Sequence, residues 1–298
     1  MFYIREPKLR EIKKARYIDR IVHRWVVDNF IYPTFVPSFI NTSYACLKNR
    51  GMHKSATDIQ KTMKHLEHTW GNYYILKMDV RKYFYSIDKR VLLKILERKI
   101  KDPKLMWLIK EIIYSDEGDV GLPIGNYTSQ LFANIYLNEV DQYIKRELHI
   151  KYYFRYMDDS VLFVKTKEEA KDTLAKISKF LDEKLHLELN QKTQIFKSKQ
   201  GVNFCGYKIN AYRLKLRDKG KKKFKKKIKY LTGQIYKGKM STEEARKYLC
   251  GHIGYMKYAN CHNFLSKYVI IAKPFDSEKE KATEGEQKWT MFGLMEQS

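Results

Sequence analysis

The chain has 298 residues, of which 44% are hydrophobic, with 59 Lys and Arg against 34 Asp and Glu and a formal net charge of +25. This length allows a substantial core, and the charge favours a polyanionic partner because each neutralised phosphate releases counterions. No apolar run approaches the ~18 residues of a membrane helix, and charged residues follow Met1 too closely for a signal peptide, so we expect a cytoplasmic protein.

The N-terminal part of the chain is predicted to be mostly helical. The predicted elements are a helix over 8–30, a helix over 55–70, a strand over 75–80 and a helix from 89 to about 101. Pro33 and Pro37 predict an extended crossing after the first helix, because the residue before a proline disfavours helix. Asp88 is interpreted as a helix-start residue.

The second half alternates strands and helices before a basic C-terminal part. Helices are predicted over 103–114, 128–148, 167–185 and from 221 onward, and strands over 152–156, 161–164, 193–196 and 203–209. Ser241 to Glu244 offers a capping box for a further helix. Residues 276–298 contain six acids and three lysines with little periodicity, which favours a mobile tail; foreign residues or a partner contact remain open.

Two adjacent acids, Asp158 and Asp159, lie between the β-rich runs 152–156 and 161–164. This pattern predicts a hairpin with acids at its tip. Acids are poor strand formers and are costly to desolvate, so either a bound divalent cation or a solvated acidic turn explains them. We favour the cation, because magnesium prefers carboxylate oxygens.

A third carboxylate, Asp79, falls near the end of the apolar strand 75–80. Neighbouring strand residues point to opposite faces, so Asp158 and Asp159 do not easily address one ion pair, and a separate strand can complete the site. Three carboxylates holding two ions are typical of in-line phosphoryl or nucleotidyl transfer.

These motifs resemble those of reverse transcriptases, in the order that the family has them. The resembling segments are 8–12, 19–23, 43–46, Asp79 with Phe84, 121–130, the Tyr-x-Asp-Asp hairpin 156–159, 189–193 and 204–207. The resemblance implies an α+β right-hand polymerase with fingers, an antiparallel-sheet palm and a helical thumb. We expect interleaved fingers and palm over 1–212 and a basic helical thumb over 213–275.

The resemblance also implies roles for individual residues in an RNA-directed DNA polymerase that binds template RNA, a cDNA primer–template duplex and dNTPs. Asp79 and Asp158 are expected to bridge two Mg²⁺ ions, with Asp159 assisting and the Val80 carbonyl as a further ligand. The expected nucleotide-binding residues are Lys8, Arg10, Phe84, Ile124, Gly125, Gln130, Tyr156, Met157 and Lys192. The expected primer grip is Phe204, Cys205, Gly206 and Tyr207. Two open alternatives are that Phe84 is a core aromatic and that Lys8 and Arg10 are surface charges.

Two departures from the family pattern narrow the subgroup. Most reverse transcriptases carry glutamine where this chain has Ile124 and proline where it has Gln130. This combination, with 251–263, resembles the enzymes of diversity-generating retroelements, which copy a template-repeat RNA inaccurately, chiefly opposite adenine, and commonly work with a small helical accessory protein. A retron-like or intron-derived enzyme of ordinary fidelity and a catalytically silent RNA-binding scaffold remain as alternatives.

Residues 215–229 carry ten Lys or Arg and one acid. The predicted nucleic-acid contacts in this run are Lys221, Lys222, Lys223, Lys225, Lys226 and Lys227. A solvated, mobile surface is the alternative. The four cysteines, Cys46, Cys205, Cys250 and Cys261, form no C-x-x-C pair. A zinc site could use Cys250, His252, Cys261 and His262, but we favour small buried thiols with RNA-facing or core histidines.

Overall fold

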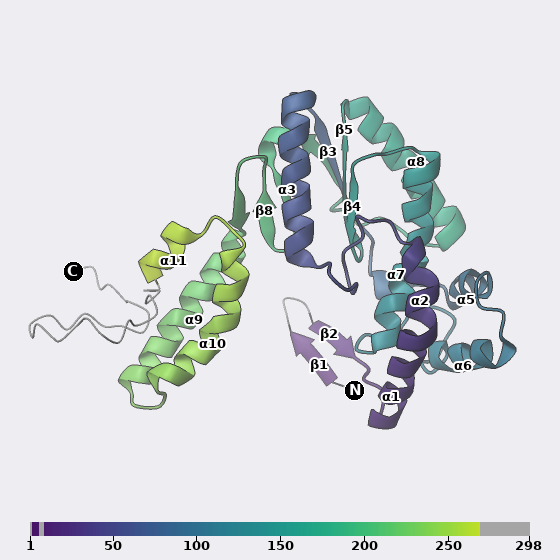
Figure 1. Cartoon of the computed structure of the whole chain (residues 1–298), viewed down its shortest axis with the longest axis horizontal. Helices are drawn as coiled ribbons and strands as arrows, with labels where there is room; N and C mark the ends of the chain where they lie inside the picture. The colour runs from purple at the N-terminus through teal and green to yellow at the C-terminus, as the bar shows by residue number, and fades with distance from the viewer. Residues whose placement is uncertain (1, 6–8, 269–298) are drawn as a thin grey trace, which may run out of the picture.

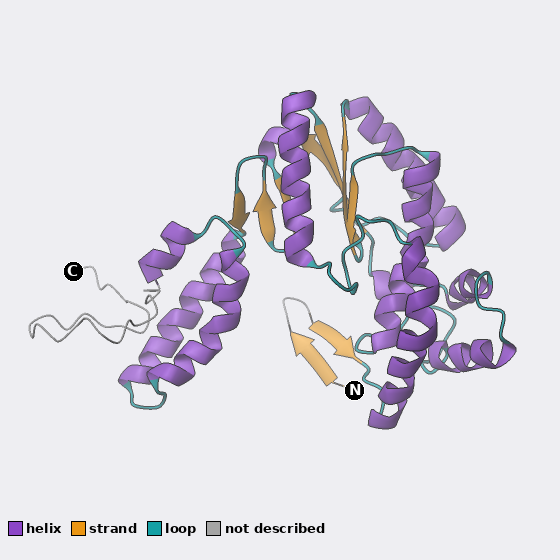
Figure 2. Cartoon of the chain, in the orientation of Figure 1, coloured by secondary structure: helices purple, strands orange, loops and turns teal. Residues whose placement is uncertain are grey.

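The computed structural model describes residues 2–5 and 9–268. Its helices are α1 (Tyr17–Val26), α2 (Tyr32–Phe35), α3 (Met52–Thr69), α4 (Tyr83–Ser86), α5 (Lys89–Glu97), α6 (Pro103–Ile113), α7 (Tyr127–Gln142), α8 (Lys167–Leu185), α9 (Asp218–Tyr236), α10 (Thr242–Lys257) and α11 (His262–Tyr268). Short π-helical or 3-10 segments are η1 (Val27–Ile31), η2 (Val36–Ser38), η3 (Tyr143–Glu147) and η4 (Ser198–Gln200). The strands are β1 (Phe2–Arg5), β2 (Leu9–Ile12), β3 (Tyr74–Asp79), β4 (Tyr153–Tyr156), β5 (Asp159–Val164), β6 (Gln194–Lys197), β7 (Val202–Phe204), β8 (Tyr207–Ile209) and β9 (Leu214–Leu216). This mixture of helices and antiparallel sheets confirms the predicted α+β class (Figure 2).

A four-stranded antiparallel sheet, ordered β4-β5-β3-β6, lies at the centre of the fold. Successive residues of its strands enter two different hydrophobic clusters, because neighbouring strand side chains point to opposite faces. Ile75 packs in one cluster with Ile59 of α3, whereas Leu76 packs in the other with Ile177 of α8. Figure 1 shows α3 over one face of the sheet and α8 over the other.

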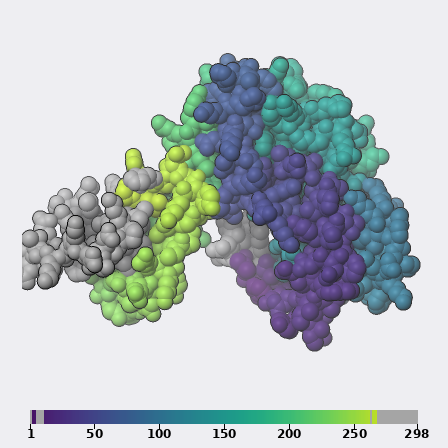
Figure 3. Space-filling model, viewed as in Figure 1, coloured from purple at the N-terminus to yellow at the C-terminus, as the bar shows by residue number. Residues whose placement is uncertain are grey.

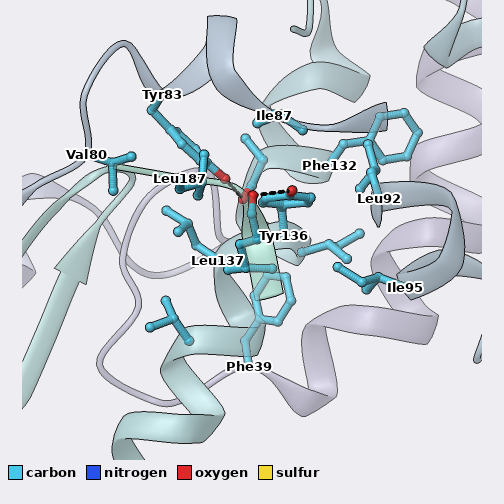
Figure 4. Close-up of a cluster of buried hydrophobic side chains, with 14 of the residues drawn as sticks. Phe39, Val80, Tyr83, Ile87, Leu92, Ile95, Phe132, Tyr136, Leu137 and Leu187 are labelled. Atoms are coloured by element: carbon cyan, nitrogen blue, oxygen red, sulfur yellow. Dashed lines mark hydrogen bonds between the residues drawn. The ribbon is translucent and has the colours of Figure 1, made fainter. Parts of the chain in front are cut away.

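The cluster on the α8 face fixes the segment that follows Asp79. Tyr83 of α4 is buried and donates a hydrogen bond of 2.5 Å to the carbonyl of Ala133 in α7. Tyr136, also buried in α7, donates one of 2.7 Å to the carbonyl of Leu185. Figure 4 shows these tyrosines among the surrounding apolar side chains. Both phenol groups thus reach partners while their rings fill the core. The Tyr83 bond ties the segment after β3 to α7, and the Tyr136 bond ties α7 to the end of α8.

The chain leaves the central sheet after β6. The expectation that 193–196 and 203–209 close one sheet is therefore only half correct, since β7, β8 and β9 form a separate three-stranded sheet. The turn η4 and Gly201 redirect the chain between the two sheets. Gly201 has a φ of +67°, and a Cβ there would lie 2.6 Å from the carbonyl oxygen of Ile209, so the turn requires glycine.

Helices α9, α10 and α11 pack beyond the second sheet. Phe224 of α9 and Leu249 of α10 belong to the same buried cluster as Phe204 of β7 and Ile59 of α3, so the core is continuous from α3 to these helices. Figure 3 shows a hollow on this face between α9–α10 and the β1–β2 hairpin.

The prediction for the N-terminal region is wrong in two respects. Residues Leu9–Ile12 form β2, paired antiparallel with β1, and the helix begins only at Tyr17. Pro33 and Pro37 do not lie in an extended crossing; they lie in the first turns of α2 and η2, and the residue before each proline is itself helical. Local apolar spacing could not reveal the β1–β2 pairing.

Other predictions are confirmed. The helix predicted at 167–185 is α8, and the one at 103–114 is α6. Asp88 caps α5 by accepting from the backbone N–H groups of Arg90 and Val91. Ser241 and Glu244 form the predicted capping box of α10. The long helix expected over 128–148 is α7 followed by the π-helical η3.

Candidate active site

Asp79 and Asp159 lie directly opposite each other, at the end of β3 and the start of β5. Opposed residues of an antiparallel pair project to the same face, so the two carboxylates share one side of the sheet. Asn190 holds Asp79 from the loop after α8: its side-chain amide donates to Asp79 Oδ2 at 3.0 Å, and its backbone N–H donates to the Asp79 carbonyl at 2.7 Å.

Asp158 lies in the tight turn between β4 and β5, after Met157, whose φ is +53°. Asp158 is half-buried and lines a small cavity with Met78, Val80 and Ser160, which are on the α8 side of the sheet. Val80 is buried and forms an isolated bridge with Leu189.

A buried polar network around Arg155 contacts the turn between β4 and β5. Arg155 of β4 contacts both carboxylate oxygens of Asp141 in α7, with the shortest separation 2.6 Å. Its guanidinium also donates to Asn134 Oδ1 at 3.0 Å and to the Met157 carbonyl at 3.2 Å. The bond to Met157 lies in the β4–β5 turn itself, so Arg155 links α7 to the turn that carries Asp158 and leads into Asp159.

Asp159 is a half-buried carboxyl group with charged neighbours of both signs. Its pKa is raised to about 6, chiefly by burial and also by the nearby charges of Asp79 and Asp158, while the ammonium of Lys77 partly opposes this rise. Lys77 Nζ lies 2.8 Å from Asp159 Oδ1 and donates a hydrogen bond of 3.0 Å to Oδ2. The three carboxylates therefore interact electrostatically.

The donor set fits a hard divalent cation. Within residues 2–5 and 9–268, no three His, Cys, Asp or Glu side chains are gathered closely enough to hold a metal ion as they stand. The oxygens of Asp79, Asp158 and Asp159 nevertheless come from two facing strands and the turn between β4 and β5, and carboxylate oxygens are the ligands that Mg²⁺ prefers.

Two expected nucleotide-binding segments lie against each other. Phe84 is half-buried, and its carbonyl accepts a hydrogen bond of 2.7 Å from Leu122 N–H. The half-buried Ile124 accepts one of 3.0 Å from Lys13 N–H. Gly125 has a φ of +120°, and a Cβ there would lie 2.8 Å from Ile12 Cγ2. The loop 121–126 is thus seated on both α4 and the strand β2.

The other expected nucleotide contacts are placed separately. Gln130 is exposed at the start of α7 and accepts a hydrogen bond of 3.2 Å from Cys46 Sγ. Tyr156 is half-buried, and burial raises its pKa. Lys192 is exposed, and its backbone N–H donates to Asn190 Oδ1 at 3.1 Å. Lys8 lies outside the described residues, and Arg10 is described only as the β2 residue paired with Ile4.

The expected primer-grip residues form the β7–β8 hairpin. Cys205 and Gly206 make its turn, with φ values of +46° and +84°. Tyr207 is buried, donates to the Tyr255 carbonyl at 3.1 Å and lies 2.7 Å from Nδ1 of His53. The Tyr255 hydroxyl in turn donates to the Cys205 carbonyl at 3.2 Å. The hairpin is therefore anchored to both α3 and α10.

The basic run lies on β9 and α9. Phe224, Ile228 and Leu231 are buried, so the lysines fall on the remaining surface of the helix. Lys222, Lys223, Lys225 and Lys226 are exposed, whereas Lys221 and Lys227 are half-buried. Of the cysteines and histidines considered for zinc, Cys250 is exposed and Cys261 is buried.

Sequence reasoning missed three residues around the carboxylates. Lys77, Asn190 and Arg155 all lie inside motifs identified from the sequence, but their contacts cross between distant segments. A lysine in the middle of the apolar strand 75–80 was the available signal for the first of them. Within the described part of the chain, no helix has the length and apolar character needed to cross a bilayer.

Residues 5–209 match the family model of reverse transcriptase (RNA-dependent DNA polymerase). The chain therefore belongs to the reverse transcriptase family, as the motifs predict. The solved structure of apo telomerase from Candida tropicalis has a similar fold, with a TM-score of 0.54 and 14% identity over 75% of this chain and 45% of that one.

Relatives of this chain include proteins of several kinds. The chain is 28% identical to protein YkfC of Escherichia coli strain K12, over 68% of this chain and 63% of YkfC. It is 24% identical to the group II intron-encoded protein LtrA of Lactococcus lactis subsp. cremoris, over 69% of this chain and 45% of LtrA. It is 25% identical to the retron Ec73 reverse transcriptase of Escherichia coli, over 82% of this chain and 77% of that protein. The chain thus spans less than two thirds of YkfC and LtrA.

Proposed function

We propose that the protein is an RNA-directed DNA polymerase that extends a primer by two-metal nucleotidyl transfer. The observation that carries this proposal is the facing pair Asp79 and Asp159, with Asp158 at the adjoining turn. The family assignment of residues 5–209 supports it. A chain that only bound RNA would have no need of three interacting carboxylates, which are costly to bring together.

In this proposal Asp79, Asp158 and Asp159 hold two Mg²⁺ ions, with the Val80 carbonyl as a further ligand. Bound there, Mg²⁺ would activate the primer 3′-hydroxyl and stabilise charge on the departing pyrophosphate. The surrounding side chains orient the carboxylates that would hold the ions. Asn190 fixes the Asp79 carboxylate, and Arg155 fixes the turn that carries Asp158.

Residues around this centre would select and orient the substrates. The ring of Phe84 would lie beneath the sugar and exclude a 2′-hydroxyl, which selects dNTPs. Lys192 would give a proton to pyrophosphate, and Lys8 and Arg10 would contact the triphosphate, which arginine matches bidentately. The hairpin Phe204–Tyr207 would place the primer end, because a misplaced nucleophile forfeits much of the rate.

The nucleic acid would occupy the hollow between α9–α10 and the β1–β2 hairpin (Figure 3). The proposed parts are fingers and palm over 1–212 and a thumb over 213–275. The exposed lysines of α9 would contact phosphates of the template–primer duplex or of a structured RNA. This basic surface of α9 is expected to raise the affinity for nucleic acid without selecting a particular base sequence.

We further propose a role in a diversity-generating retroelement of a bacterial or mobile-element genome, with a small helical accessory protein as partner and the cytoplasm as location. Ile124 motivates this proposal, because an isoleucine cannot make the polar contacts of the usual glutamine amide, and looser nucleotide selection follows. A retron-like or intron-derived enzyme of ordinary fidelity is the second candidate, favoured by the relatives LtrA and retron Ec73.

Primer extension on a defined RNA template, with Mg²⁺, dNTPs and base-by-base sequencing of the cDNA, tests both proposals. Errors concentrated opposite template adenine, and reduced in Ile124→Gln, would support the retroelement role. Faithful cDNA would favour the second candidate. An error spectrum that Ile124→Gln leaves unchanged would contradict the role given to Ile124.

A further inference from the structure

Lys77 lies in the middle of β3, where its neighbours Leu76 and Met78 are buried. Its own side chain is only 23% exposed. A lysine in a mostly apolar strand must satisfy a charged group with three donors, so its partners indicate why it is there.

The ammonium of Lys77 contacts two sheets at once. It lies 2.8 Å from Asp159 Oδ1, in the four-stranded sheet, and donates a hydrogen bond of 2.6 Å to the carbonyl of Asn203, in the three-stranded sheet. It also lies 5.7 Å from the ring centroid of Phe204. One side chain therefore connects a candidate metal-binding carboxylate to the strand that opens the candidate primer grip.

We propose that Lys77 is a positioning residue that clamps Asp159 to the Asn203 carbonyl and thereby sets the distance between the carboxylates and the β7–β8 hairpin. This inference rests on the proposed polymerase function. The physical basis is geometric: attack by a primer hydroxyl needs its oxygen within about 3–3.5 Å of the reacting phosphorus, and a displacement of about 1 Å can cost ~100-fold in rate. Lys77 acts on the reaction only through Asp159 and the hairpin.

A different account makes Lys77 a counter-ion that only balances the charge of Asp159. The two accounts differ in what they expect for primer placement when Lys77 is removed. Loss of a counter-ion tightens divalent-cation binding, because a competing positive charge is gone, and leaves primer placement unchanged. Loss of a clamp shifts the primer end, whatever happens to cation affinity.

The test uses Lys77→Met and Lys77→Gln, with Lys77→Arg as the variant that keeps the charge. Lys197→Met is the matched control. Lys197 is an exposed lysine of the same sheet and lies on β6, opposite Tyr74 of β3. Placement is read from the fluorescence of 2-aminopurine at the primer 3′ terminus in metal-free complexes. Rate is read from single-nucleotide addition under single-turnover conditions at saturating dNTP, and cation binding from Mn²⁺ titration followed by electron paramagnetic resonance.

We expect Lys77→Met and Lys77→Gln to change the 2-aminopurine signal and to slow single-nucleotide addition at least ~10-fold, with Lys77→Arg closer to wild type. Mn²⁺ affinity should be unchanged or higher, and Lys197→Met should match wild type. If Lys77→Met does not fold, Lys77→Gln is judged by the same criteria. An unchanged fluorescence signal and a rate within ~2-fold of wild type, with tighter Mn²⁺ binding, would overturn the clamp.

Failure of the inference is distinguishable from failure of the proposed function. If wild type extends the primer but the Lys77 variants do so equally well, only the clamp is rejected. If wild type binds template–primer and Mn²⁺ yet extends no primer, the polymerase proposal is rejected. The clamp is still judged in that case, because the fluorescence measurement requires no chemistry.

Discussion

Arg155 and Asp141 form a fully buried ion pair directly beneath the turn that carries Asp158. Their side chains are 2% and 0% exposed, and Nη2 lies 2.6 Å from Oδ2. Asp141 belongs to α7 and Arg155 to β4, so the pair ties the hairpin to a helix of the α8-side core. The position of the candidate active site therefore depends on a contact that takes no part in the chemistry.

Breaking this pair from one side is expected to be costly. Arg155→Met leaves the Asp141 charge buried and unpaired, which typically costs about 3–5 kcal/mol of unfolding free energy. The double variant Arg155→Met, Asp141→Leu should recover much of that loss, since no buried charge remains. Urea denaturation of the wild type, both single variants and the double variant measures the coupling. A double variant as unstable as Arg155→Met would contradict this account of the pair.

The raised pKa of Asp159 predicts a pH-dependent stability. Because this acid keeps its proton more tightly in the folded state, its contribution to stability is greatest below pH 4 and is lost as pH rises through about 6. The shift from 3.8 to about 6 corresponds to about 2–3 kcal/mol. In metal-free buffer, Asp159→Asn should therefore gain stability over the wild type between pH 4 and pH 7. Denaturation of both proteins at several pH values checks this, and a constant difference would refute it.

Gly125 is expected to be required for the shape of the loop that carries Ile124. Gly125→Ala combines an unfavourable positive φ with a Cβ 2.8 Å from Ile12 Cγ2, so the loop must move. Gly118→Ala is the matched control, because Gly118 also has a positive φ but nothing lies within 4 Å of its added Cβ. We expect the KM for dNTP to rise several-fold more in Gly125→Ala than in Gly118→Ala. Steady-state primer extension measures both, and equal effects would mean that contact with Ile12 does not matter.

The exposed lysines of α9 are expected to contact phosphates. Replacing Lys222 and Lys226 by Gln should weaken template–primer binding and lower the slope of log affinity against log salt by about 1–2. The control pair is Lys176→Gln, Lys179→Gln on α8, which removes the same charge from another helix. Binding isotherms at several salt concentrations give both slopes. Equal slopes for the two double variants would show that the effect of α9 is general charge and not local contact.

Local sequence patterns were sufficient for the helices α6 and α8 and for the acidic hairpin, because periodicity, capping residues and turn chemistry act over a few residues. They failed at 8–12, where pairing with β1 overrides helical spacing, and at 203–209, where Gly201 sends the chain into a second sheet. A metal-binding role for Asp158 and Asp159 was predicted because acids are unfavourable in a strand and costly to desolvate. The residues that contact these acids were not predicted, because the contact of Asn190 with Asp79 spans 111 residues and that of Lys77 with Asp159 spans 82.

The central claim is that Asp79, Asp158 and Asp159 catalyse template-directed DNA synthesis. The most direct test is extension of a DNA primer on an RNA template with Mg²⁺ and dNTPs, comparing wild type with the Asp158→Ala, Asp159→Ala variant at equal template–primer occupancy. We predict cDNA from the wild type and none above background from the variant, with RNA binding retained. Synthesis that survives the double change would contradict the assignment of these carboxylates as the catalytic centre.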